Sequence, residues 1–197
     1  MTSILKADTI QDTDGNNIIN ENSNTITIGA SGDTTNIIGT LQNNGAAVGG
    51  ANTPAFMATT SSQQTLSNNT LTKIEFATEV VDTDNCYDPS TNYRFTPTTS
   101  GKFNIFLVAS METTGGVSTA NFGILRLYKN GSTLLHQSYH DNSNNNGYAI
   151  ALSVNAIVDM NGSSDYLEAF VYANASSGAI KVQNSTYTMF GGYKIIE

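Results

Sequence analysis

Residues 54–197 consist of short runs in which apolar and polar residues alternate, and each run is bounded by Asn, Gly, Ser or Asp. In KFNIFLVAS the side chains at every second position are Phe103, Ile105, Leu107 and Ala109. Such an alternation predicts a strand that buries one face, and no segment has the 3.6-residue period of an amphipathic helix. About ten runs separated by turn residues predict an all-β sandwich of two packed sheets.

The same pattern sets the bounds of the expected strands. They are 55–60, 70–79, 92–97, 102–112, 122–130, 133–140, 148–160, 165–174, 179–184 and 187–197. In DYLEAFVY the predicted core face consists of Leu167, Ala169 and Val171. Asn130 and Gly131 are the pair typical of a two-residue hairpin turn, so we expect a hairpin there.

Charged residues are scarce, and this limits the kinds of partner. The formal net charge is −8, and the chain has eight Lys and Arg residues. Nucleic-acid backbones and anionic membranes attract clustered basic residues, so neither is an expected partner. No stretch approaches the roughly 20 apolar residues of a spanning helix, and the first residues do not resemble a secretion leader. Because Cys86 is the one cysteine, no intrachain disulfide forms, and we expect a protein made in a reducing cytoplasm.

Residues 1–50 differ from the rest, because their apolar pieces are very short and are interrupted by Gly, Asn and Asp. Strands this short do not fold alone. The larger apolar residues include Ile26, Ile28, Ile37, Ile38 and Leu41. A single chain cannot bury this row, so we expect an intertwined β stem of three identical chains, or docking onto a different protein. The glycine-rich segment 45–50 is the expected hinge between this stem and a domain at 51–197.

The order of motifs in the second region resembles a known family. The segments are PAFMA at 54–58, CYDPSTNYRFTPTTSGKFNIF at 86–106 and YTMFGGYKI at 187–195. They are similar to the globular head of complement component 1, subcomponent q, and to its tumour necrosis factor-like relatives. The resemblance covers 54–196. It implies a ten-stranded jelly roll that assembles as a tight homotrimer about a threefold axis.

The resemblance also implies roles for the aromatic residues and for one connection. Strand NYRF is expected to turn at 96–101 and to pair with the strand that follows it. The aromatic side chains are expected to fill the sandwich and the trimer seam, and the candidates are Tyr87, Phe95, Phe103, Phe190 and Tyr193.

The chain departs from that family in its stem, which has no Gly-X-Y collagen repeat. Residues 3–50, beginning SILKADTIQDTDGNNII, are instead similar to the stems of tail-fibre and appendage proteins of marine bacteriophages. Together the two resemblances imply a virion surface protein, assembled in the host cytoplasm, whose stem binds other virion proteins through Ile4, Leu5 and Ile10. The head is then a fibre knob for host attachment. The alternative is a capsid decoration or head-fibre protein that coats or stabilises the shell.

Three polar loops are the candidates for contact with the host. They lie at 111–121, 140–147 and 174–179, and loops on a rigid sandwich commonly form recognition surfaces. The candidate residues are His140, Asn142, Asn144, Asn145 and Asn174. Such side chains suit sugar hydroxyls or polar protein epitopes, and the alternative is that these segments are merely soluble turns.

Two further clusters contain residue types that could bind a metal ion or take part in catalysis. Asp82, Asp84 and Asp88 could hold calcium, although the glycine and glutamate of a known calcium loop are missing, and the alternative is a solvated turn. His136 and His140, with Asp141 adjacent, are the only hint of a glycan-processing enzyme. No nucleophile and base occur at a recognised spacing, so we expect no enzyme activity and no cofactor, with calcium as the possible exception.

Overall fold

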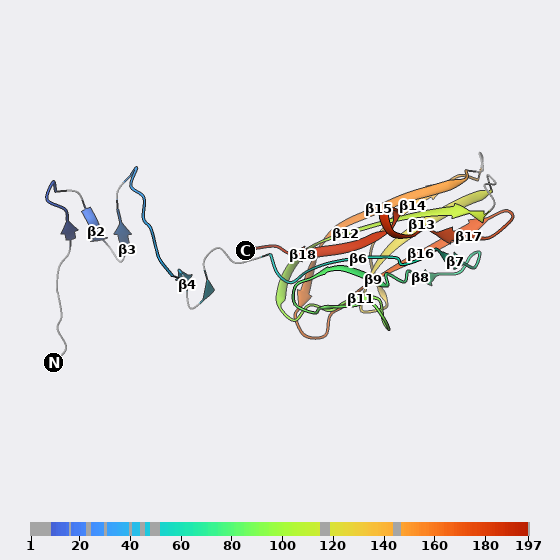
Figure 1. Ribbon diagram of the computed structural model, residues 1–197, viewed down its shortest axis with the longest axis horizontal. Coiled ribbons are helices and arrows are strands. Elements are labelled where there is room, and N and C mark those ends of the chain that lie inside the picture. Colours follow the sequence, from blue (N-terminus) through green and yellow to red (C-terminus); the bar gives the residue numbers. More distant parts are fainter. Residues whose placement is uncertain are drawn as a thin grey trace. The chain divides into compact units, whose positions relative to one another are not determined.

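The computed structural model describes residues 9–15, 17–22, 25–29, 31–39, 41–43, 46–47, 52–114, 119–143 and 147–196. The chain divides into two compact units, Met1–Gly50 and Ala51–Glu197. Figure 1 shows short strands in the first unit and long strands in the second. Of the expected hinge, the structure describes residues 46–47, which form strand β5 (Ala46–Ala47) paired with β4 (Gln42–Asn43).

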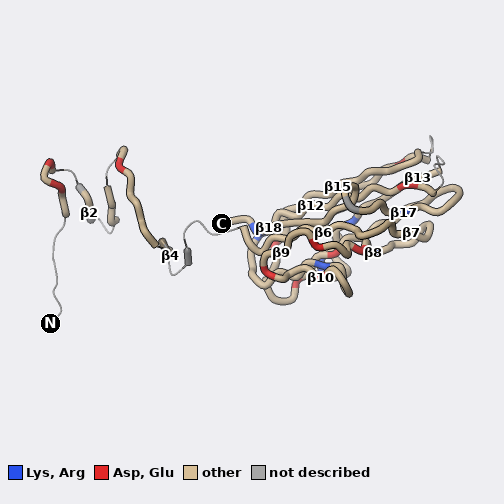
Figure 2. The backbone as a smooth tube through the Cα atoms, viewed as in Figure 1, with Lys and Arg blue, Asp and Glu red and all other residues tan. Residues whose placement is uncertain are grey.

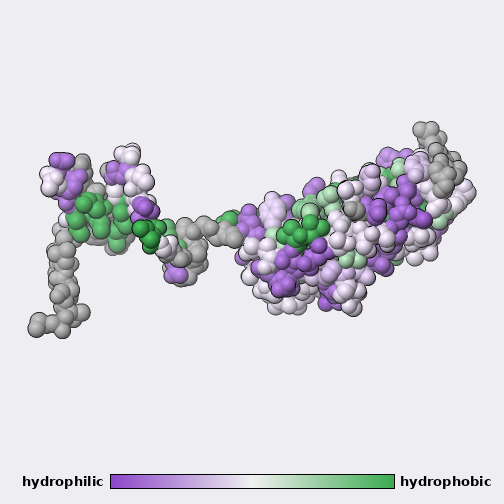
Figure 3. All heavy atoms as spheres, viewed as in Figure 1, coloured by the Kyte–Doolittle hydropathy of each residue, from purple (hydrophilic) through white to green (hydrophobic). Residues whose placement is uncertain are grey.

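The first unit is a small antiparallel meander whose apolar side chains lie at the surface. Strands β1 (Thr9–Gln11), β2 (Asn17–Asn22) and β3 (Thr25–Ile28) pair in sequence order. Ile26 is 68% exposed and Ile38 is 96% exposed. Figure 3 shows hydrophobic residues at the surface of this unit. One copy of the chain therefore leaves them uncovered within this unit.

The second unit is a sandwich of two sheets, as the alternating pattern predicted. The seven-stranded sheet contains β7 (Gln64–Leu66), β17 (Ile180–Val182), β12 (Ser100–Thr113), β18 (Met189–Lys194), β6 (Ala55–Thr59) and β9 (Thr78–Asp82), with β15 (Ala149–Asn161) paired to β12. The six-stranded sheet contains β10 (Tyr87–Asp88), β11 (Arg94–Phe95), β16 (Leu167–Ala175), β13 (Ala120–Lys129) and β14 (Thr133–Asp141), with β8 (Thr72–Lys73) paired to β16. A 3₁₀ turn, η2 (Ser185–Tyr187), precedes β18.

Some expected strand bounds need correction. The run 70–79 is divided into β8 and β9, which belong to different sheets, so the chain crosses the sandwich between them. Strands β7 and β10 were not expected. The β13–β14 hairpin forms, and Asn130 and Gly131 both have positive φ, but three residues rather than two separate the paired ends.

The pairing expected for NYRF is wrong. Strand β11 pairs with β10 and β16 in the six-stranded sheet, whereas β12 belongs to the other sheet. The turn at 96–99 therefore carries the chain from one sheet to the other. Local sequence identifies the two strands, but it does not say which sheet each strand joins.

The core lies between the two sheets, and its predicted faces are confirmed. Phe103, Ile105, Leu107 and Ala109 of β12 are fully buried, and so are the three core residues predicted for β16. An aromatic cluster fills one part of this core. Its rings are those of Phe56, Phe76, Tyr87, Phe95, Phe103 and Phe190.

The aromatic cluster links the two sheets. Phe56 of β6 stacks on Phe95 of β11, with ring centroids 4.2 Å apart, and meets Phe190 of β18 edge-on at 4.9 Å. The Tyr87 hydroxyl donates a hydrogen bond of 3.1 Å to the Phe76 carbonyl, and burial raises the pKa of that hydroxyl. Tyr87, Phe95 and Phe103 thus serve to join β10, β11 and β12 across the sandwich.

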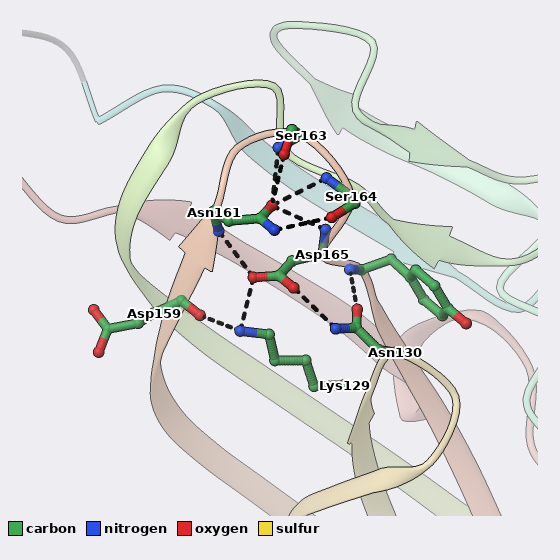
Figure 4. Close-up of polar contacts among 8 residues, drawn as sticks. Lys129, Asn130, Asp159, Asn161, Ser163, Ser164 and Asp165 are labelled. Carbon is green, nitrogen blue, oxygen red and sulfur yellow. Dashed lines mark hydrogen bonds and ion pairs between the residues drawn. The ribbon is translucent and has the colours of Figure 1, made fainter.

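A polar clamp closes the end of the sandwich where the β13–β14 and β15–β16 turns meet (Figure 4). Lys129 forms an ion pair of 2.8 Å with Asp165 and donates a hydrogen bond to the Asp159 carbonyl. Asn130 donates to the Asp165 carboxylate at 2.9 Å, and its own side-chain oxygen accepts from the Tyr166 amide. Asp165 is buried, and the hydrogen bonds from Asn130 and Lys129 lower the pKa of its carboxyl to about 2. The clamp therefore needs a carboxylate.

We expect Asp165→Asn to destabilise the second unit by about 1–3 kcal/mol at neutral pH, because either amide orientation places a donor against a donor. Since the folded pKa is lowered, the carboxylate stabilises the protein above about pH 4 and loses that effect as the pH falls through about 2. Urea unfolding at several pH values measures this. The difference between wild type and variant should shrink between about pH 4 and 2. A pH-independent difference would show that the charge is not what matters.

Candidate interaction surfaces

The outer face of the seven-stranded sheet is apolar at its centre. Phe106 and Val108 point away from the core, and β12 places them opposite Gly191 and Met189 of β18. A Cβ atom at residue 191 would overlap the Phe106 ring, so glycine lets this ring lie across the sheet. Met57 of β6 continues the same row. Figure 3 shows a hydrophobic area on this face, over β18 and β6, with hydrophilic residues around it.

The rim of this face is polar but mostly uncharged. Asn155 and Ser153 of β15 lie opposite Phe106 and Val108. Ile157, on the same strand, is 67% exposed. Figure 2 shows that most of the backbone drawn there belongs to uncharged residues. On this face the charged side chains of β12 lie at its two ends, Lys102 beside Asp159 and Glu112 near the other end. A face of this composition can meet an identical copy without opposing like charges.

The structure separates the five aromatic candidates for the core and the seam. Tyr87, Phe95, Phe103 and Phe190 lie in the interior of one chain, and Tyr193 is 39% exposed on the outer face of β18. The five candidates for the core and the seam do not include Phe106, Val108 or Met189, which line the outer face. The sequence does indicate this apolar outer face. The run KFNIFLVAS has apolar residues on both faces, which is typical of a strand that is covered on both sides.

The three candidate loops meet at one end of the second unit, which we call the tip. The Thr114 amide donates to the Ala179 carbonyl at 2.8 Å, and the Ala120 amide donates to the Gly147 carbonyl at 2.9 Å. Asn121 donates from its side chain to Asn174 at 2.6 Å. The tip is thus one hydrogen-bonded surface rather than three separate turns.

The candidate residues of the tip are only partly described. His140 and Asn142 contact each other, with 2.7 Å between the ring nitrogen Nε2 and the side-chain oxygen. Asn174 accepts the bond from Asn121. Asn144 and Asn145 lie outside the described residues, as do 115–118 in the first loop.

The first strand of the second unit starts at the opposite end, which we call the base. The Lys194 amide donates to the Pro54 carbonyl, and Lys194 pairs with Phe103 near the start of β12. Thr113, at the end of β12, pairs with Ile180 beside the loops. Ten residues of extended strand separate these two positions, which corresponds to about 33 Å. Figure 1 shows the second unit elongated along these strands.

In the acidic turn at 82–88, two carboxylates accept hydrogen bonds from backbone amides of the same chain. Asp82 accepts hydrogen bonds from the amides of Cys86 and Tyr87 at 3.0 and 2.8 Å. Asp88 accepts from the amides of Ser90, Thr91 and Asn92, and these bonds lower the pKa of its carboxyl. Both groups cap turns, and among the described residues no three His, Cys, Asp or Glu side chains form a metal cluster.

The two histidines lie on the same side of β14 but do not form a site together. His136 pairs with Leu127 and His140 with Gly123. Four residues along a strand correspond to about 13 Å, which is too far for two ligands of one metal ion. The neighbouring carboxyl of Asp141 accepts hydrogen bonds from Ser143, which lower its pKa.

No family model matches the sequence, and no curated protein matches it. Solved structures match the second unit. The globular domain of zebrafish complement 1qA protein has 16% identity and a TM-score of 0.50, and the match covers 73% of this chain and 98% of that one. Murine APRIL has 11% identity and a TM-score of 0.53, with 72% and 98% covered. Eiger TNF from S. frugiperda has 10% identity and a TM-score of 0.51, with 73% and 92% covered.

At these identities the similarity shows the fold alone. The second unit is an all-β jelly-roll sandwich of the type found in the complement and tumour necrosis factor proteins, and the fold predicted from the order of motifs is confirmed. Among the described residues no helix is long and apolar enough to cross a membrane.

We expect calcium to shift the melting temperature of the protein by less than about 1 °C, because Asp82 and Asp88 are already bonded to backbone amides. Thermal unfolding with calcium, with magnesium at equal ionic strength and with a chelator tests this. A rise of several degrees in calcium alone would contradict it. Asp88→Asn should lower the melting temperature equally with and without calcium.

Proposed function

We propose that the chain is a trimeric structural protein of a bacteriophage particle, with the first unit attached to the virion and the second unit exposed as a knob that contacts the host surface. The observation that carries this proposal is the grouping of three polar loops at the tip, opposite the base. A knob joined to a particle through its base presents its tip outward. The phage context is supported by the resemblance of residues 3–50 to phage appendage stems.

The homotrimer is supported by two apolar surfaces that one chain leaves open. One is the outer face of the seven-stranded sheet with Phe106, Val108 and Met189, and the other is the row of exposed isoleucines in the first unit. Large exposed apolar patches usually mark interfaces. Identical copies about a threefold axis cover both surfaces at once, because each copy supplies the same two patches.

Attachment to the particle is assigned to the start of the chain. Ile10 of β1 is exposed, whereas Ile4 and Leu5 lie outside the described residues. Other virion proteins are the partners of this segment, and assembly takes place in the host cytoplasm. We infer no enzyme activity, since Cys86 is buried and the histidines are too far apart to act on one bond or one metal ion.

For the trimer we predict a solution mass three times the 20.9 kDa of one chain. Residues 51–197 alone should remain trimeric if the sheet face suffices, and Val108→Asp in that fragment should give monomers because three carboxylates would be buried at the seam. Leu134→Asp, on the exposed strand β14 of the other sheet, is the matched control and should stay trimeric. Light scattering after gel filtration gives the masses. A monomeric full-length chain would contradict the trimer, whereas a monomeric fragment would assign it to the stem.

The place of the protein on the particle is tested by gold-labelled antibodies against residues 54–197 on purified virions. Label at the tail tip supports host attachment, and the purified protein should then compete with infection. Label spread over the capsid would overturn the attachment role in favour of decoration of the shell. Absence of label from particles would overturn the virion assignment altogether.

A further inference from the structure

Three aromatic rings lie side by side on the outer face of the six-stranded sheet. Phe122 of β13 stacks against Tyr172 of β16, with ring centroids 5.7 Å apart and an angle of 24° between the rings. Tyr139 of β14 lies 6.3 Å from Phe122 on the other side and is 55% exposed. Ile124 pairs with both tyrosines and lies between them. We call Phe122, Tyr139 and Tyr172 the aromatic platform.

Polar groups surround the platform. The Arg126 guanidinium lies 5.8 Å from the centroid of Tyr172, and its Nε donates to the Gln137 side chain at 3.1 Å. Asn174 and Asp141 both lie opposite Phe122 in the register, one on each neighbouring strand. The rim thus offers guanidinium and amide donors together with carboxylate and amide acceptors.

The charge of the rim is balanced. Arg126 forms no ion pair with any carboxylate among the described residues, and Asp141 forms none with a Lys or Arg there. One cation and one anion therefore flank the rings without neutralising each other by contact. The chain as a whole carries a net charge of −8, which repels a polyanion.

We propose that the aromatic platform binds an uncharged hexopyranose unit of a surface glycan, with the sugar ring packed against the exposed parts of its aromatic rings. The C–H groups on one face of a pyranose fit the negative face of an aromatic ring. Its hydroxyls both donate and accept, which matches a rim that contains Arg126, Asp141 and Asn174. This inference rests on the proposed function and names the site and the ligand class for host contact.

The platform also lies where a glycan can reach it. It is on the opposite side of the sandwich from the face assigned to the trimer seam, so association of three chains leaves it open. It begins at the tip, because Asn174 of the rim accepts a hydrogen bond from Asn121 of the loop surface. Three copies per trimer would turn a weak single contact into useful avidity.

A printed array of defined neutral and acidic oligosaccharides, probed with the full-length protein, is the first test. We expect binding to glycans with terminal or internal neutral hexopyranoses. Tyr172→Ala should weaken binding about tenfold or more, because it removes half of the stacked pair. Tyr187→Ala removes an exposed tyrosine outside the platform and should bind like wild type. Circular dichroism and the oligomer mass confirm that both variants fold.

The second measurement maps the site by NMR with tyrosine rings labelled in the full-length protein. Titration with the best neutral glycan from the array should move the ring signals of Tyr139 and Tyr172. Binding that moves only signals of the tip, or binding that Tyr172→Ala leaves unchanged, would overturn the platform while keeping a host-binding knob. The platform proposal would also be overturned if the protein bound only acidic glycans, bound only protein ligands, or bound no glycan at all. Failure of the proposed function is recognised separately, because it appears as absence of gold label from the particles.

Discussion

Strand β12 is the element on which the rest of the second unit depends. It pairs along one edge with β15 and along the other with β18 and β17, so neither edge is free. Its alternation sends Phe103, Ile105 and Leu107 into the core and Phe106 and Val108 to the outer face. A strand that is apolar on both faces needs a cover on both sides, and one chain supplies only the inner one. The pattern that builds the sandwich therefore also leaves an apolar outer face, which further copies of the chain can cover.

The two ends of the sandwich have different chemistry. At the base, Lys129, Asn130 and Asp165 close the turns with charged groups that satisfy one another, which leaves little for a partner to bind. At the tip, neutral side chains such as Asn121 and Asn174 bond to each other. A hydrogen bond to an ionised group is stronger than one between neutral amides. The base is thus suited to stabilise the fold. The tip is suited to exchange its internal hydrogen bonds for hydrogen bonds to a ligand.

Much of this fold could be predicted from sequence, and the failures have a common cause. The core faces of β12 and β16 followed from local alternation, which depends only on residues within one strand. The sheet to which β11 belongs, and the division of 70–79 between two sheets, depend on pairing with distant strands that local patterns do not encode. The platform was missed for the same reason, because Phe122, Tyr139 and Tyr172 meet only once β13, β14 and β16 are aligned. The tip loops were recognised because loop composition is local.

The outer faces of the two sheets differ in a way that assigns them different roles. On the seven-stranded sheet the central rows contain Phe106, Val108, Met189 and uncharged neighbours, so burying them against identical copies requires no desolvation of charge. On the six-stranded sheet the aromatic side chains are flanked by ionised ones, as Lys73 beside Phe170 and Arg126 beside Tyr172 show. Covering these cations with a dry protein interface would cost their hydration. A small, hydroxyl-rich ligand can stack on the rings while the charged groups keep their contact with water. The outer face of the six-stranded sheet is therefore better suited to binding such a ligand from solvent than to forming a protein interface.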